Sequence, residues 1–211
     1  MHGLERMQIE ITDDQCEALL GYVELLVKWN KVINLTAVRD PQEMVRRHIL
    51  DSLAVHEHID SSTLIDVGAG AGLPGIPLAI LKPHMNVTLI DSVAKKTRFI
   101  QQAALALKLA NVTVLHSRVE EVDEQAQLVI ARAFAAPEKL ASLTRHLLPP
   151  AGRLVAMVGQ MPERERLEKI SGFSLIKTAK LTIPDETAER NIVILQRDPC
   201  LLYTSPSPRD S

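Results

Sequence analysis

Short apolar runs alternate with helical patterns along the middle of the chain, and this alternation constrains the fold more than any other feature. Each run is short enough to be a strand buried on both faces. The runs cover residues 63–68, 86–91, 112–117, 128–134 and 152–158. Helical patterns occupy 74–82, 94–110 and 137–148, and 118–125 is a loop or a short helix. Such alternation predicts an α/β fold with an open, largely parallel sheet and helices on both faces.

The segment that follows these runs adds an antiparallel element. After a helix at 162–170, two late strands at 174–183 and 191–197 are joined by the short loop PDETAER, which favours a hairpin. Five strand units followed by a hairpin are the element order of the Rossmann-like fold of methyltransferases that use S-adenosylmethionine (AdoMet). The expected sheet is therefore seven-stranded and mostly parallel, and this expectation rests on a fold-level analogy.

The chain divides into three expected parts. Residues 1–60 are a helical extension, because Thr12 and Gln15 match a capping box and Asp40-Pro41 is a helix-start signal. Residues 61–197 form the sheet domain that binds the cofactor. Residues 198–211 are rich in proline and serine without periodicity, so we expect a disordered tail of non-native origin.

Composition limits the classes of partner. The formal net charge is −2 and aromatic residues make up 3% of the chain, which argues against a generally basic RNA-coating protein and against a surface with several stacking rings. No apolar run reaches membrane-spanning length, so no membrane partner is expected. Cys16 and Cys200 have no metal-ligand spacing, so we expect no metal site and a reducing, cytoplasmic location.

The stretch LIDVGAGAGLPGI (64–76) places a glycine-rich loop directly after the first strand, where a doubly wound sheet binds its ligand. It contains the G-x-G-x-x-G pattern of dinucleotide sites, with Gly70 as its first glycine. However, Pro74 lacks an N–H for a pyrophosphate, and the Asp66 carboxylate would repel one. Cationic AdoMet instead gains from Asp66, directly or through the loop that this residue orders. Gly68 and Gly70 are accordingly expected to contact AdoMet, although a glycine-rich turn can also bind nothing.

Three other positions at the same sheet edge are candidates for ligand contacts. Asp91 ends the second strand, where an acid accepts hydrogen bonds from ribose hydroxyls, and it has an equal claim to be a helix N-cap. Glu120 follows the third strand and flanks the expected adenine site, or is simply a solvated charge. Arg132 interrupts an apolar run, so it is either functional or part of a structural ion pair.

Several motifs together resemble one family, the ribosomal RNA small subunit methyltransferase G family, also known as glucose-inhibited division protein B. The resemblance covers about residues 10 to 197. The motifs are KWNKVINLTAVRDPQEMVRRHILDS (28–52), LIDVGAGAGLPGIPLAI (64–80), LIDSVAKKTRFI (89–100), SRVEE (117–121), IARAFA (130–135) and GQMP (159–162).

This resemblance implies an AdoMet-dependent enzyme that methylates N7 of a guanine in 16S ribosomal RNA, guanine 527 in the family's usual numbering of that RNA. The family's cofactor contacts fall on Gly68, Leu73, Val119, Glu120 and Arg132. One departure is Val158, where family members often have lysine, and it puts a basic contact to RNA or cofactor in doubt.

The residues suggest a mechanism without a general base, and no catalytic residue is identified. Guanine N7 carries a lone pair and no proton, so positioning against the methyl group should suffice. RNA contacts are expected from a basic cluster at Arg46, Arg47 and His48, although an ordinary solvated helix face explains each residue singly. The resemblance implies 16S ribosomal RNA or the small ribosomal subunit as the substrate. Alternatives are an AdoMet enzyme acting on a small molecule or protein, or a non-enzymatic nucleotide-binding regulatory module.

Overall fold

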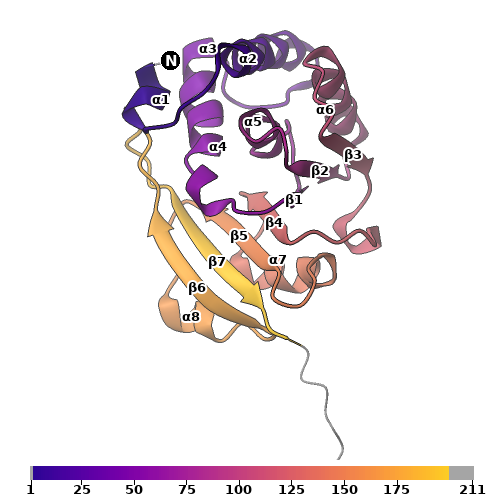
Figure 1. Cartoon of the computed structure of the whole chain (residues 1–211), viewed down its shortest axis with the longest axis vertical. Coiled ribbons are helices and arrows are strands. Elements are labelled where there is room, and N and C mark those ends of the chain that lie inside the picture. The colour runs from indigo at the N-terminus through magenta and orange to yellow at the C-terminus, as the bar shows by residue number, and fades with distance from the viewer. Residues whose placement is uncertain (1, 200–211) are drawn as a thin grey trace, which may run out of the picture.

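A computed structural model describes residues 2–199 of the 211-residue chain. Seven strands form one sheet in the order β3-β2-β1-β4-β5-β7-β6 (Figure 1). Their bounds are β1 Thr63–Val67, β2 Asn86–Asp91, β3 Val112–His116, β4 Leu128–Arg132, β5 Arg153–Val158, β6 Phe173–Lys180 and β7 Asn191–Arg197. The first five strands are parallel, and β7 pairs antiparallel with both β5 and β6. The predicted mostly parallel sheet with a C-terminal hairpin is confirmed.

Helices cover both faces because successive side chains of each strand point to opposite sides. In β1, Leu64 faces a core shared with α5 (Gly75–Leu81) and α6 (Ala94–Ala106). Ile65 faces a second core shared with α7 (Pro137–Thr144) and α8 (Arg164–Glu168). Short 3-10 helices follow β3 at η3 (Val119–Glu121) and α7 at η4 (Arg145–Leu147). The sheet is therefore the middle layer of three.

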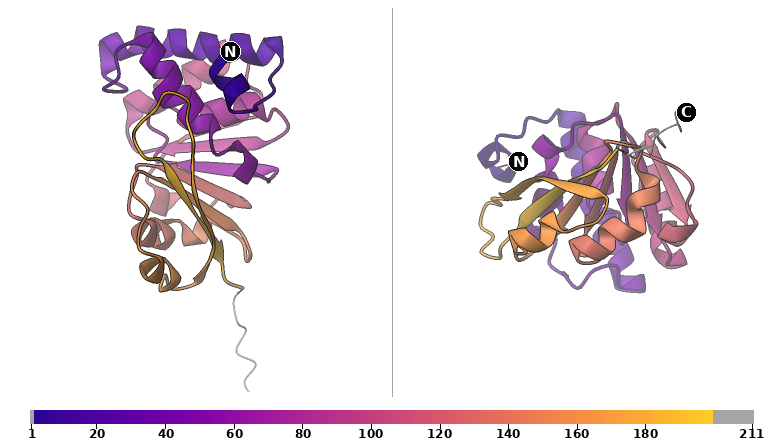
Figure 2. Two further views of the ribbon diagram at one scale, coloured as in Figure 1. Left: turned by 90° about the vertical axis from the view of Figure 1, so that its left-hand side faces the viewer. Right: turned by 90° about the horizontal axis from the view of Figure 1, so that it is seen from below.

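The N-terminal helices add to the layer formed by α5 and α6. Figure 2 shows the long helix α2 (Asp13–Ile33) lying across that end of the molecule, while the loop that joins β6 and β7 reaches up to the N-terminal helices. The expected capping box at Thr12 and Gln15 is confirmed, and so is the N-cap at Asp40. Short helices α1 (His2–Arg6) and η2 (His56–His58) flank this segment. Its buried side chains belong to the same core as those of α5 and α6.

The helix predicted to start at Asp40 contains a π-helical stretch that the sequence does not indicate. It runs without a break as α3 (Pro41–Met44), the π-helical η1 (Val45–Leu50) and α4 (Asp51–Leu53). Isolated π-helical turns are rare and recur at functional sites. Here the stretch carries the basic cluster and leads directly into Asp51.

Two predicted bounds are too long for one local reason. The strand expected at 128–134 stops at Arg132, because Ala133 takes a left-handed φ of 51°. The helix expected at 94–110 ends at Ala106, and Lys108 beyond it has a φ of 55°. In both cases the chain turns at a residue other than glycine, and the residue type gives no indication of the turn.

The expected tail begins within the described chain. Asp198 still binds the sheet, since its backbone N–H donates to the Gly172 carbonyl. Residues 200–211 of the tail predicted from the sequence lie outside the described residues. Within residues 2–199, no helix has the length and hydropathy that are needed to cross a bilayer.

Candidate functional site

The loop after β1 turns by placing glycines in the left-handed region. Gly68 and Gly70 have φ of 67° and 61°, which L side chains rarely adopt. A Cβ at Gly68 would lie 2.2 Å from the Phe134 ring, whereas a Cβ at Gly70 would meet nothing closer than the Gly68 carbonyl at 3.8 Å. Gly70 therefore faces open space at the carboxyl edge of the sheet, where a ligand is expected.

Asp66 acts on this loop from below. Its side chain is fully buried and lines neither of the two cavities described below, and its Oδ2 accepts from the Gly75 backbone N–H at 2.8 Å. Burial raises the pKa of this carboxyl to about 7. Of the two routes expected for Asp66, the structure supports the indirect one, in which the residue orders the loop. Because this pKa is close to physiological pH, Asp66 carries only part of a negative charge. The expected attraction of AdoMet and repulsion of a pyrophosphate by this carboxylate are therefore weaker than a full charge would give.

Asp91 supports the loop from the neighbouring strand. Its Oδ2 accepts from Gly70 N at 2.9 Å, and its Oδ1 accepts from Val93 N at 2.8 Å. Helix α6 begins at Ala94 with Val93 as its N-cap, so the N-cap role expected for Asp91 is wrong by two residues. Lys96 Nζ lies 3.7 Å from the same carboxylate. Each carboxylate oxygen keeps a further lone pair for a ligand hydroxyl.

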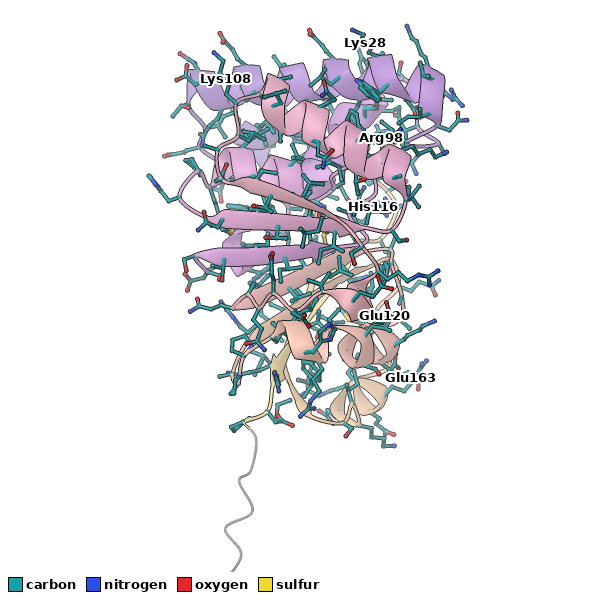
Figure 3. All side chains as sticks on the ribbon, turned by 90° about the vertical axis from the view of Figure 1, so that its right-hand side faces the viewer. Lys28, Arg98, Lys108, His116, Glu120 and Glu163 are labelled. Atoms are coloured by element: carbon teal, nitrogen blue, oxygen red, sulfur yellow. The ribbon has the colours of Figure 1, made fainter. Side chains whose placement is uncertain are left out.

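A cavity of about 380 Å³ lies beside Asp91. Its lining includes Asp91, Val93, Lys96, Arg118, Val119 and Glu120. Val119 is buried, while Glu120 is exposed. Figure 3 labels Glu120 and His116, which lie on the same side of the molecule as Arg98. The structure thus brings the predicted Asp91, Val119 and Glu120 together around one cavity.

A larger cavity of about 640 Å³ lies on the other side of the loop. The N-terminal segment, the glycine loop, the ends of β4 and β5, and the start of β7 all contribute to it. Predicted residues in its lining are Arg47, His48, Gly68, Gly70, Leu73, Arg132 and Val158. Both cavities share Gly68, Ala133 and Phe134. The two cavities therefore meet above Gly68.

Arg132 lies in the larger cavity and also makes an ion pair. Its Nη1 is 2.8 Å from Asp51 Oδ2, and Arg190 Nε is 2.7 Å from Asp51 Oδ1. The Asp51 side chain is only 3% exposed. The structural ion pair expected as one of the two roles of Arg132 is therefore present, with Asp51 as its partner. Because Arg132 lines the cavity as well, the same side chain can also meet a ligand.

The expected RNA-contact residues are each engaged within the protein. Arg46 binds Glu43, and Arg47 lies 3.7 Å from Glu186. His48 is 6% exposed, and its Nε2 lies 2.8 Å from Thr36 Oγ1. Burial, and next the Arg132 guanidinium, lower the pKa of His48 to about 4. His48 is therefore neutral at physiological pH and lines the larger cavity without adding charge.

Among the lining residues that the sequence did not single out are Thr36, Phe134 and Arg190. Thr36 and Arg190 lie in loops with no periodic pattern, and nothing local indicates their partners. Phe134 had a usable signal, since it is a large aromatic side chain at the end of the predicted buried strand, two residues after Arg132.

Solved structures share this fold at low sequence identity. A 1,6-didemethyltoxoflavin-N1-methyltransferase of Burkholderia thailandensis matches with a TM-score of 0.58 and 15% identity, covering 90% of this chain and 92% of that one. The magnesium protoporphyrin IX methyltransferase of Synechocystis PCC 6803 matches with a TM-score of 0.58 and 18% identity, covering 89% and 99%. These likenesses establish the Rossmann-like methyltransferase fold.

Sequence comparisons are more specific. Residues 15–193 match the family model described as GidB, rRNA small subunit methyltransferase G. The "Ribosomal RNA small subunit methyltransferase G" of Pseudomonas entomophila is 47% identical over 199 residues, which is 92% of each chain. The protein of the same name from Photobacterium profundum is 45% identical over 194 residues, covering 91% of this chain and 94% of its own.

Proposed function

Since the chain belongs to the rRNA small subunit methyltransferase G family, and is therefore an AdoMet-dependent rRNA methyltransferase, we propose that it methylates N7 of one guanine in 16S ribosomal RNA. The guanine is position 527 in the family's usual numbering of that RNA. The small ribosomal subunit or its RNA is the partner, and the cytoplasm is the place of action.

The residues around the glycine loop fit AdoMet. The cavity beside Asp91 suits the adenosine half, with the Asp91 carboxylate accepting from ribose hydroxyls and Val119 and Glu120 flanking the adenine. The open space at Gly70 gives the backbone room to approach the ligand. Arg132, which lines the larger cavity, is our candidate for binding the cofactor's carboxylate. Bound AdoMet supplies a methyl group on a sulfonium. The observation that carries the proposal is that the two cavities meet at Gly68.

The larger cavity suits the methyl acceptor. N7 of a neutral guanine needs no general base, so the protein has to exclude water and hold the ring in line with the methyl group. Positive charge grows on the purine during transfer, and a cation beside it would oppose the reaction. His48 is held neutral there, and the Asp51 carboxylate offsets part of the charge of Arg132 and Arg190, which both pair with it. These two features reduce the positive charge that the purine meets as it becomes cationic.

The RNA must present the guanine outside a regular helix. A-form RNA keeps N7 in a deep, narrow groove, so the target belongs to a loop or an irregular region. Arg46, Arg47 and His48 lie on the η1 stretch, of which Arg47 and His48 line the larger cavity, and we assign Arg46 and Arg47 to the RNA backbone. Their partners Glu43 and Glu186 would then be exchanged for phosphates.

Mapping the modification tests this function. Purified enzyme is incubated with methyl-labelled AdoMet and either free 16S ribosomal RNA or small subunits, and 7-methylguanine is located by chemical cleavage. We expect one labelled guanine on RNA, at the N7 position. Label on another atom of the base would refute the N7 assignment. Label on small metabolites or protein but not on RNA would support the alternative of a small-molecule or protein methyltransferase.

A further inference from the structure

Phe134 is an aromatic side chain left open to solvent at the sheet edge where the cavities meet. It is 40% exposed, and every other aromatic side chain among residues 2–199 is more deeply buried. Tyr22, Trp29 and Phe99 form a ring cluster inside the N-terminal layer instead. Phe134 therefore has large apolar area uncovered at the one edge where a ligand is expected.

The backbone fixes where this ring lies. Ala133, just before it, has a φ of 51°, which ends β4 and turns the chain over the glycine loop. The ring lies so close to Gly68 that a Cβ there would be 2.2 Å from Cδ2 and 2.8 Å from Cε2. Only a glycine at position 68 allows this contact. The ring is therefore supported from one side by the loop, while it lines both cavities.

We infer that the Phe134 ring stacks on the guanine that receives the methyl group. This inference rests on the proposed function and adds the residue that holds the base. Every base has a π-face, and stacking on an aromatic side chain is the usual way in which an unpaired RNA base is held. A ring at the junction of the two cavities contacts the base at the point where it meets the cofactor.

The chemistry of transfer gives the ring a second contribution. The N7 lone pair forms the new bond to the methyl carbon while the carbon–sulfur bond breaks, and its electron pair stays on sulfur. Sulfur loses its positive charge, and the purine becomes a cation without any proton transfer. The face of an aromatic ring attracts such a charge. An aliphatic side chain of similar size would fill the space without this attraction.

Variants at position 134 separate these contributions. Phe134→Tyr keeps the ring, and Phe134→Leu keeps apolar bulk without it. We expect the Tyr variant to stay within about threefold of the wild-type kcat/KM for RNA. The Leu variant should lose roughly 10- to 100-fold, the size expected for one base stack. AdoMet affinity, measured by calorimetry, should change less than about threefold in both. Ile176→Ala, an exposed apolar residue of β6 outside both cavities, is the matched control.

The contrary outcomes are distinct. A Leu variant with full kcat/KM, or a Tyr variant as impaired as the Leu variant, would overturn the stacking role. A loss of AdoMet affinity equal to the loss of kcat/KM would place the ring against the cofactor instead and would also overturn it. Wild-type enzyme that leaves RNA unmethylated under the same conditions would refute the proposed function itself.

Discussion

At the residue scale, Asp51 links two distant parts of the chain through one buried carboxylate. Its oxygens bind Arg132 of β4 and Arg190, the loop residue just before β7, at 2.8 and 2.7 Å. Both arginines also line the larger cavity. A carboxylate removed from water is retained here because two guanidinium groups satisfy it. Removal of its charge leaves two cations facing each other.

Asp51→Asn should therefore lower the free energy of unfolding by about 1.5–3 kcal/mol, the usual effect of losing hydrogen bonds to a charged group. The midpoint of urea unfolding measures this. Asp185→Asn is the matched control, because Asp185 pairs with Arg6 at 2.7 Å but is 68% exposed. This control variant should lose less than about 1 kcal/mol of its free energy of unfolding. Equal losses in the two variants would show that burial of Asp51 adds nothing.

Asp66 gives stability a dependence on pH. Burial raises its pKa from the ordinary 3.8 to about 7 in the folded chain. Between these two pH values the folded state retains a proton that the unfolded state releases. The contribution of Asp66 to the free energy of unfolding is therefore full below pH 4 and is lost as the pH rises to about 7. Asp66→Asn should remove this decline. Unfolding free energies from pH 4 to 8 test it, and parallel profiles for wild type and variant would contradict the assignment.

At the scale of the element, adding a side chain to the glycine loop has two separate effects on stability, which are backbone strain and a clash with a neighbouring side chain. Gly70→Ala should cost only the left-handed conformation, about 1–2 kcal/mol of stability. Gly68→Ala adds a clash with Phe134, so its loss should be larger. Both variants should weaken AdoMet binding. Thermal unfolding and calorimetry measure the two effects, and a Gly68 variant no less stable than the Gly70 variant would show that the ring moves away freely.

Helices and strands that neighbouring residues determine were predictable from the sequence. Features that depend on packing, and contacts between residues far apart in the chain, were not. The capping box at Thr12 and the strand at 86–91 were found because neighbouring residues determine them. The π-helical stretch at 45–50 and the left-handed Ala133 depend on packing, so no periodicity indicates them. Arg190 reaches Asp51 across 139 positions, a separation at which a sequence pattern has no information about pairing.

At the scale of the whole molecule, the loop between β6 and β7 joins the N-terminal helices through three ion pairs. Figure 1 shows this loop beside α1 and α4. Its ion pairs join Asp185 to Arg6, Glu186 to Arg47, and Arg190 to Asp51. Two of these pairs reach the larger cavity. The hairpin that distinguishes this sheet from a wholly parallel one therefore also closes one side of the candidate site.

The same arrangement predicts where an acidic protein holds RNA. The net charge is −2, so attraction must be local, and Arg47 is a partly exposed cation that lines the larger cavity. Arg47→Ala should raise KM for RNA several-fold and reduce the slope of log KM against log salt by about 1, as expected for one lost phosphate contact. AdoMet affinity should hold. Arg164→Ala, on α8 and paired with Glu168, should change neither quantity. Equal effects of the two substitutions would assign RNA attraction to overall charge rather than to this face.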